Sequence, residues 1–488
     1  MNVESAKESM RSTARSYDAE PPRPRHHSHP PTWATDLHVL MLAAAVVISM
    51  WRGVAAAAVA VVALWLARPP HALLLLATLL AVVGAWRADR SWADAQPRHV
   101  GAYTGWANVA ADPAPFGRAL RVTLEVEGER FDAWCYGRVR AKLAERQQGE
   151  RVWVQGVRRT LDGTAARRAA IRHVVGRMDL EVVADWADEG VLWRAGNRVR
   201  TALRGAADAA MQPNDAALFT GLVIGDDSRQ PLEMIERFRA SGLSHLTAVS
   251  GQNVALLLAA ASPLLRRLRP WARWLTTLGL VVWFMGVTRF EPSVLRAGAM
   301  AMLASTAFLA GRDARPVRLL GWAVAGLVLL DPMLVWSVGF WLSVGATLGV
   351  CSAGPWLESR LPGPGWLTAP LGVTLGAQLG VVVPSLLVFG RLPLVSVLAN
   401  LVAVPAAGFV MLVGLPAGLL AAAVPGAAEV VLLPAEVGTR WVATVAFVAS
   451  EIEPSPAVGV VGWLLTLLGV VVLLARLHLR GRGSRVAS

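Results

Sequence analysis

Residues 238–258, with the sequence FRASGLSHLTAVSGQNVALLL, hold the densest group of polar side chains in an otherwise apolar stretch. Polar side chains inside a bilayer cost free energy unless they have partners, so such a group usually faces a bundle interior or a wet cavity. The segment is therefore predicted to line a path through a membrane. The candidate lining residues here are Ser241, His245, Ser250, Gly251, Gln252 and Asn253.

Two other interpretations of this segment have to be weighed. Small residues and hydroxyls also let membrane helices approach closely, so helix packing stays open as an alternative. A Ser–His nucleophile pair is not expected, because on one continuous helix His245 and Ser250 would point about 140° apart. His245 would share its face with Ser241 and Gln252, and no residue nearby would orient the imidazole.

Four more polar residues interrupt later apolar runs. Asp331 precedes Pro332 at an expected helix end, where capping explains it. Arg296, Gln378 and Asn400 complete the candidate lining set. The alternatives are a snorkelling arginine at the membrane surface for Arg296, and interhelical hydrogen bonds for the two amides.

Residues 88–190 have a different pattern, in which apolar and polar residues alternate. The stretches Leu120–Val126, Phe131–Tyr136 and Arg151–Val157 have the period of two that is typical of β-strands, and glycine-bearing turns precede two of them. Several short strands at this spacing predict a small barrel.

Aromatic and basic residues are interleaved within that region. Residues 117–177 hold fourteen Arg or Lys against seven Asp or Glu, although the counts over 88–190 are sixteen and fifteen. Basic grooves with stacking aromatic rings hold single-stranded nucleic acids, whereas the bland alternative is that the rings fill the barrel core. The candidate DNA-binding residues are Arg121, Trp134, Tyr136, Arg138, Arg140, Trp153, Arg158 and Arg159.

Motifs for other chemistries are missing from the sequence. There is no glycine-rich phosphate loop that ends in Lys-Ser/Thr, so the chain is not expected to be its own ATPase. Cys135 and Cys351 are the two cysteines, too few for a disulfide framework or a cysteine-based zinc site. The HHSH at 26–29 lies in a polar arm with a disordered composition. We expect no metal, no cofactor and no catalytic residue.

The composition is that of a membrane protein. Hydrophobic residues make up 55% of the 488 positions, the mean hydropathy is +0.46, and 17% of residues are charged. A soluble protein would have about 25% charged residues. Apolar runs separated by short basic or proline-bearing breaks predict spanning helices.

The order of these runs predicts the organisation of the chain. Three short runs, Leu37–Trp51, Gly53–Leu66 and Ala72–Trp86, precede the β region. A basic amphipathic helix at Val191–Gln212 is expected to lie in the membrane interface. The larger membrane region is predicted to have helices near 214–225, 231–241, 243–265, 271–288, 293–310, 317–330, 333–353, 366–389, 393–423, 430–450 and 456–476, of which 430–450 is a candidate re-entrant or amphipathic segment.

Basic loops predict the orientation. RRLRPWAR at 266–273 and GRDARPVR at 311–318 are separated by two spans, so the positive-inside rule places both in the cytoplasm. The β region is then extracytoplasmic, and the basic C-terminal tail is cytoplasmic.

Four blocks resemble the ComEC-type competence family, in the same order. They are GLVIGDDSRQPLEMIERFRASGLSHLTAVSGQNVALL, PSVLRAGAMAML, GRDARPVRLLGWAVAGLVLLDPMLVWSVGFWLSVGA and AQLGVVVPSLLVFGRLPLVSVLANLVAVP, within roughly 221–405. The upstream helices and β region resemble that family's N-terminal part with its OB-like domain.

The resemblance implies a membrane channel that imports single-stranded DNA during natural transformation. It also implies a DNA receptor and a cytoplasmic helicase or single-strand-binding protein as partners. Two departures stand out. Many members carry a C-terminal metallo-β-lactamase-like domain, for which nothing after Leu477 supplies metal ligands, and many have histidine where this chain has Asn253. We therefore expect no nuclease activity.

These observations predict a mainly α, polytopic protein of the cell membrane, with about 9–11 membrane helices and an inserted OB-like barrel. The alternative function is transport of another solute or a lipid on the same scaffold. The expected regions are a disordered arm at 1–35, N-terminal membrane helices at 36–87, the β domain at 88–190, the interfacial helix at 191–212, the channel domain at 213–478 and the basic tail at 479–488.

Overall fold

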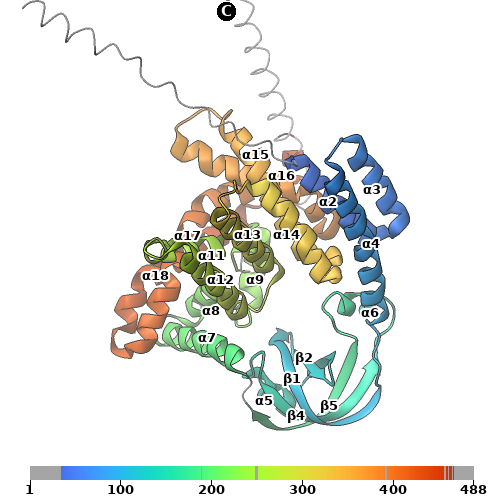
Figure 1. The fold of residues 1–488 in the computed structure, drawn as a ribbon. Helices are drawn as coiled ribbons and strands as arrows, with labels where there is room; N and C mark the ends of the chain where they lie inside the picture. Colours follow the sequence, from blue (N-terminus) through green and yellow to red (C-terminus); the bar gives the residue numbers. More distant parts are fainter. Residues whose placement is uncertain are drawn as a thin grey trace, which may run out of the picture. The chain divides into compact units, whose positions relative to one another are not determined.

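The computed structural model describes residues 35–187, 190–247, 251–390 and 393–455, followed by residues 458, 459, 461–463 and 465. The predicted arm with its HHSH motif, the lining candidate Ser250, most of the 456–476 segment and the basic tail lie outside the described residues. The remainder is a mainly helical protein with one small barrel (Figure 1).

Three N-terminal helices come first. They are α2 (Asp36–Arg52), α3 (Val54–Leu66) and α4 (His71–Ala93). Both α3 and α4 pack on α2, and α4 is longer than the predicted run because it continues through a polar last turn with Asp89 and Arg90. This extension carries the chain from the helices to the barrel.

The β region is a closed five-stranded barrel with the strand order β1-β2-β3-β5-β4. Its strands are β1 (Gly101–Phe116), β2 (Ala119–Val126), β3 (Glu129–Cys135), β4 (Arg151–Thr160) and β5 (Gly176–Ala187). Helix α5 (Gly137–Ala144) connects β3 to β4, α6 (Gly163–Ala170) connects β4 to β5, and β3 pairs with β5 in parallel. The barrel is therefore OB-like, as expected.

Alternation within the strands builds the barrel core. Val122 and Leu124 of β2 point inward together with Phe131 and Ala133 of β3, and all four are fully buried. The intervening residues point away from this core, where Thr123 and Asp132 are buried and hydrogen-bonded to each other, whereas Trp134 is exposed. Sequence periodicity predicted three of the five strands.

Helix α7 (Val191–Ala210) leads into the larger helical region. It is followed by α8 (Pro213–Ile224), α9 (Leu232–Ala240), α10 (Ser244–Thr247), α11 (Gly251–Leu265), α12 (Pro270–Val287), α13 (Pro292–Leu309), α14 (Pro316–Leu330), η1 (Pro332–Trp336), α15 (Val338–Glu358), α16 (Gly365–Phe389), α17 (Ser396–Ala423), η2 (Pro425–Ala427) and α18 (Ala428–Ile452).

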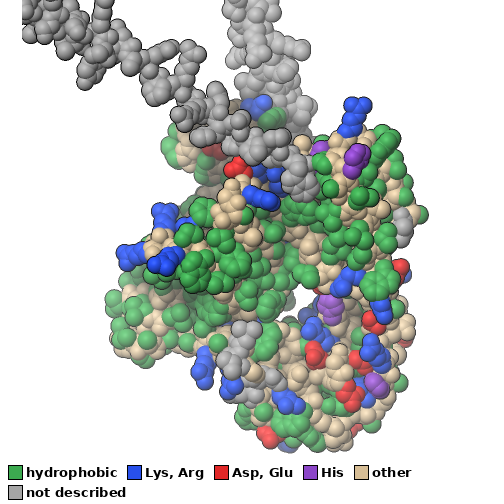
Figure 2. Space-filling view, viewed as in Figure 1, with side chains coloured by type: hydrophobic (Ala, Val, Ile, Leu, Met, Phe, Trp, Pro, Cys, Tyr) green, Lys and Arg blue, Asp and Glu red, His purple; other side chains and the backbone are tan. Residues whose placement is uncertain are grey.

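Six helical stretches in the described part are long and apolar enough to cross a membrane. They are His71–Ala93, Pro292–Leu309, Val338–Glu358, Gly365–Val388, Ser396–Ala423 and Pro425–Ile452; three shorter apolar helices are Ala55–Leu66, Gly251–Leu265 and Pro316–Leu330. Hydrophobic side chains cover the helices, whereas charged ones are frequent on the barrel (Figure 2). The protein is therefore a polytopic membrane protein.

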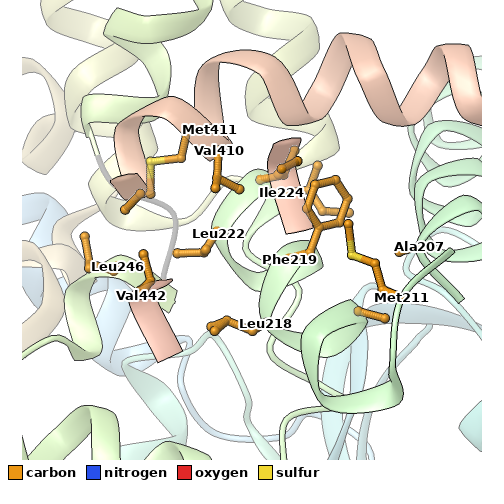
Figure 3. Close-up of a cluster of buried hydrophobic side chains, with 14 of the residues drawn as sticks. Ala207, Met211, Leu218, Phe219, Leu222, Ile224, Leu246, Val410, Met411 and Val442 are labelled. Carbon is orange, nitrogen blue, oxygen red and sulfur yellow. The ribbon is translucent and has the colours of Figure 1, made fainter. Parts of the chain in front are cut away.

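Two regions hold the large helices together. Glycines of α15 and α16 face each other so closely that a Cβ on Gly349 would lie 1.9 Å from the Gly376 carbonyl oxygen. A second contact is an apolar core in which Phe219 and Leu222 of α8 meet Val410 and Met411 of α17 (Figure 3). Helix α18 packs along α17 and is a single continuous helix, so it does not re-enter.

Contacts with the barrel show which ends of helices α12 and α14 lie on the barrel side. Arg289, just after α12, and Asp331, just after α14, both contact barrel residues. The basic loops at 266–273 and 311–318 join the other ends of these helices. The two loops therefore lie on one side and the barrel on the other, in agreement with the pattern that predicted a cytoplasmic location for the loops. The side of the membrane itself stays a prediction.

Candidate functional site

The polar segment at 238–258 is not one helix. Helix α9 ends at Ala240, and Gly242 adopts a φ of +74°, a left-handed conformation that favours glycine. Ser241 is fully buried, and its Oγ donates to the Phe238 carbonyl. The prediction that Ser241 shares a helical face with His245 is therefore wrong, because the turn at Gly242 separates them. The His245 Nδ1 lies 3.3 Å from the Gly242 carbonyl oxygen.

This turn rests on the beginning of α17. A Cβ on Gly242 would lie 2.5 Å from the Cβ of Ser396, so any larger residue would push the two elements apart. The Ser396 Oγ also accepts a hydrogen bond of 3.0 Å from the Gln378 Nε2 of α16. One turn further along α17, Asn400 is buried, and its Oδ1 has no partner among the described residues. Two of the predicted lining residues thus gather around Ser396.

The other end of the segment contacts three helices. A Cβ on Gly408 of α17 would lie 3.2 Å from the Gln252 Nε2. The Asn253 Nδ2 donates to the Leu222 carbonyl of α8 at 3.0 Å, and Asn253 is 4% exposed. Asn253 also contributes to the lining of a small, mainly apolar cavity of about 40 Å³. An interhelical hydrogen bond thus accounts for Asn253 in this conformation, and its role as a lining residue stays a prediction.

Arg296 lies inside the helical bundle and not at its surface. It is 5% exposed, its Nε donates to the Ser343 Oγ of α15 at 2.8 Å, and its Nη1 lies 3.4 Å from the Met300 sulfur. Its Nη2 lies against Gly251, where a Cβ would be 2.8 Å away. The snorkelling alternative does not describe this buried side chain.

The barrel carries a cluster of exposed aromatic and basic side chains on β2, β3 and the adjoining turns, which we call the β2–β3 face. Arg121 and Trp134 are direct cross-strand partners. Trp134 meets Phe116 edge to face at 5.3 Å between ring centroids, and Trp134 is 41% exposed. Tyr136, at the end of β3, is also exposed. Core packing explains none of these rings.

Helix α5 adds cations next to this face. Arg138 and Arg140 lie in its first turn, and the Arg140 Nη1 donates to the Arg118 carbonyl at 3.2 Å. Five of the predicted DNA-binding residues, namely Arg121, Trp134, Tyr136, Arg138 and Arg140, therefore belong to β2, β3 and α5.

The other three predicted residues lie on β4. Trp153 is the cross-strand partner of Trp106 in β1. Arg158 is buried and pairs with Glu127 at 2.7 Å, and Arg159 pairs with Asp179 at 2.7 Å. Both arginines thus pair with a carboxylate of the barrel, Arg158 with the turn between β2 and β3 and Arg159 with β5, and these ion pairs account for their charges.

A buried ion-pair network, which sequence reasoning missed, joins the barrel to the helices. Asp112 of β1 accepts from the Arg200 Nη2 of α7 at 3.0 Å and from the Arg289 Nε at 2.9 Å. Arg200 is also 3.4 Å from Asp226, which accepts a hydrogen bond from Arg204. Four Arg residues on one predicted amphipathic helix were visible, but their partners are distant in sequence.

Polar contacts of α7 extend this network. The Asn197 Nδ2 donates to the Gln148 carbonyl at 3.1 Å, and the Gln147 Nε2 donates to the Thr201 Oγ1 at 2.9 Å. Leu203 and Ala207 on the same helix are buried in the apolar core. Helix α7 is thus packed against protein on two sides, and its predicted interfacial location remains a prediction.

The network holds its carboxylates in the charged form. Burial alone would raise the pKa of Asp112, but Arg200 and Arg289 outweigh it and lower that pKa below its ordinary value. Burial acts in the same direction on Asp226, where the hydrogen bond from Arg204 and the charge of Arg200 lower the pKa well below the usual range. The pairs therefore stay ionised at all physiological pH values.

Metal chemistry has no support in the described ranges. No group of three or more His, Cys, Asp or Glu side chains there is arranged to hold a metal ion. The expected absence of catalysis stays a prediction.

Known proteins resemble this chain over its larger helical region. Residues 222–480 match the model of a family described as Competence protein. Competence protein ComA of Neisseria gonorrhoeae is 31% identical over 284 residues, which cover 54% of this chain and 38% of that protein. ComE operon protein 3 of Bacillus subtilis (strain 168) is 28% identical over 216 residues, 44% of this chain and 27% of that protein.

A third relative is the uncharacterized protein YcaI of Escherichia coli (strain K12). It is 28% identical over 218 residues, which are 40% of this chain and 28% of that protein. The chain thus spans well under half the length of each of these curated relatives. No solved structure matches it.

Proposed function

The chain belongs to the competence protein family, and we propose that it forms a channel that imports single-stranded DNA across the membrane. Its six candidate spans and its family identify it as a multi-pass inner-membrane protein. One of the curated relatives is named a competence protein and another is named after the ComE operon, and together with the family this supports a role in DNA uptake.

One observation carries the proposal beyond the family. An OB-like barrel with an exposed aromatic and arginine face is built into the same chain as the membrane helices. OB folds bind oligonucleotides on the face made by strands 2 and 3, where aromatic rings stack on bases. Trp134 and Arg121 occupy those strands here. The barrel would receive the strand before it enters the helices.

The lining set of the proposed channel comes from the signature segment and from helices α13, α16 and α17. His245, Gln252 and Asn253 from the signature segment, Arg296 from α13, and Gln378 and Asn400 from α16 and α17 supply polar groups among apolar helices. Neutral groups can contact phosphates and sugars without the tight grip of an arginine cluster, which suits a strand that must slide. A DNA receptor and a cytoplasmic helicase or single-strand-binding protein are the proposed partners.

The proposal is tested by binding of a fluorescent single-stranded oligonucleotide to the full chain in lipid nanodiscs. We expect single strands to bind more tightly than duplex, with log affinity falling by about 0.7 per contacted phosphate for each tenfold rise in salt. Weak binding without a salt dependence would contradict the proposal. It would favour a transporter of another solute or a lipid on the same scaffold.

A further inference from the structure

Arg296 is a buried cation that has no anionic partner among the described residues. Its hydrogen-bonding neighbours are the neutral Ser343 and Met300, and no ion pair joins it to a described residue. It lies on α13, one of the candidate spans. Ionisable residues inside a membrane almost always pair with one another or mark the path of an ion or substrate.

The helices that surround Arg296 contain no carboxylate near it, and Glu291, the N-cap residue of α13 five positions before Arg296, forms no ion pair with it. Helices α11, α12, α13, α14, α16 and α17 contain no Asp or Glu, and the one acidic residue of α15 is its last residue, Glu358. Glu358 is fifteen positions from Ser343, which is about 22 Å along a helix. None of the described residues therefore supplies a counter-charge to Arg296.

The guanidinium also faces the signature segment. Its Nη2 would lie 2.8 Å from a Cβ on Gly251, so the guanidinium packs directly against this glycine. Arg296 is thereby held between α11 and α15, next to the helix that carries Gln252 and Asn253.

We propose that the Arg296 guanidinium is an anion-binding site that takes phosphodiester groups of the passing strand, one after another. This inference rests on the proposed function and deepens it. A planar guanidinium can donate two parallel hydrogen bonds to a pair of phosphate oxygens, and a single site holds its anion less tightly than a cluster of arginines would. The strand would thus supply the negative charge that the protein does not.

Cys351 provides a probe of this site within the unmodified chain. It is partly exposed and lies on α15, two turns beyond Ser343, the residue to which Arg296 donates. The other cysteine, Cys135, is buried in the barrel, where burial raises the pKa of its thiol to about 11. Its labelling by thiol reagents is therefore slow, and peptide mass spectrometry distinguishes the two sites.

The experiment compares an anionic and a cationic methanethiosulfonate of similar size on the full chain in phosphatidylcholine nanodiscs. Relative to their rates with a free thiol, the anionic reagent should modify Cys351 about tenfold faster, because a fixed positive charge raises the local concentration of anions. Arg296→Gln should bring the ratio to about one, and Arg296→Lys should retain a preference. Arg312→Gln, in a basic loop, is the matched control and should change nothing.

Several outcomes would overturn the proposal. One is equal rates for the two reagents in the unmodified chain, and another is an unchanged preference after Arg296→Gln. Failure of both reagents to reach Cys351 would also count against it, because the site must be open to dissolved anions. Equal rates of the two reagents and failure of both to react are measured on the unmodified chain. Misfolding of a variant therefore cannot explain either result.

The identity of the anion is decided by protection. A single-stranded oligonucleotide should slow the anionic reagent, and nanodiscs that contain phosphatidylglycerol should not. Protection by inorganic phosphate alone, or by the anionic lipid alone, would contradict the assignment to the strand. An oligonucleotide that binds the chain but leaves Cys351 unprotected would refute this inference without refuting the proposed function. Loss of all oligonucleotide binding would refute the function.

Discussion

Two arginines of the helical region are almost equally buried and have opposite surroundings. Arg200 is 2% exposed and Arg296 is 5% exposed. Arg200 contacts the carboxylates of Asp112 and Asp226, whereas Arg296 contacts a hydroxyl and a thioether. Carboxylates thus neutralise the charge of Arg200, whereas no described residue neutralises that of Arg296.

The difference separates two uses of a buried charge. Removing one partner of a buried ion pair leaves an uncompensated charge and is strongly destabilising. Removing a buried charge that has no partner eliminates a cost. Arg200 is therefore expected to maintain the contact between the barrel and the helices, and Arg296 to serve an anion that comes and goes.

The largest expected effect is on stability and is a direct test of this contrast. Arg200→Gln should destabilise the full chain by about 3 kcal/mol, since it weakens the pairing of two buried carboxylates. Arg296→Gln should leave the stability unchanged or raise it. Thermal unfolding in detergent, and protease sensitivity of the segment between barrel and helices, would measure both. Equal losses of stability in Arg200→Gln and Arg296→Gln would contradict the proposed difference between the two arginines.

A second prediction concerns the place where single-stranded DNA first binds, which we expect to be the β2–β3 face. Trp134→Ala should weaken single-strand binding by about 1–3 kcal/mol through the loss of one stacked base. Trp186→Ala is the matched control, because Trp186 is 59% exposed on β5 and lies under Arg146, away from strands β2 and β3. Fluorescence anisotropy with the full chain measures both. If the two variants lose the same affinity, the β2–β3 face is not the binding surface.

A third prediction concerns Asn253, whose amide bridges α11 and α8. Asn253→Leu should cost little stability, since interhelical hydrogen bonds in membranes average about 0.6 kcal/mol. DNA passage should nevertheless fall if the amide also lines the path. The comparison variant is Gly251→Leu, which should lower protein abundance because its side chain would collide with Arg296. Normal DNA passage through the Asn253→Leu variant would mean that helix packing alone explains Asn253.

The smallest expected effect is that of pH on the ion-pair network. Asp112 and Asp226 have pKa values below the ordinary carboxyl range, so the stability that they contribute is present above that range. It is lost only as the pH falls through the lowered values. Hydrogen exchange of β1 should therefore be equally protected at neutral and mildly acidic pH, after correction for intrinsic rates. Loss of protection already at mildly acidic pH would mean that these carboxylates are not held by the arginines.

Local patterns predicted most of the fold. Apolar runs located nearly all the helices of the described region, and alternation located β2, β3 and β4. The long β1 strand was missed because its sequence, GAYTGWANVAADPAPF, contains two prolines and two glycines, and its register shifts twice against β2. Strand β5 was missed because most residues in its second half are exposed, so buried and exposed positions do not alternate there.

The sequence indicated which polar residues belong to the candidate site, but not which residues they contact. Arg296, Gln378 and Asn400 stood out as polar residues in apolar runs, whereas Ser396 and Ser343 did not, because serine is common in membrane helices. Ser396 lies four positions before Asn400 and so shares its helical face, a signal that could have been used. The pairing of Asp112 with Arg200 and Arg289 depends on tertiary folding alone.

Passage of DNA can be measured most directly with the purified full chain in a planar bilayer. A voltage draws single-stranded DNA from the barrel side, and quantitative amplification then detects any strand in the opposite chamber. Single strands are expected to cross and duplex is not, and Arg296→Gln should reduce the crossing while Arg312→Gln should not. Crossing no greater than through a protein-free bilayer, or equal crossing of duplex, would contradict the proposed function.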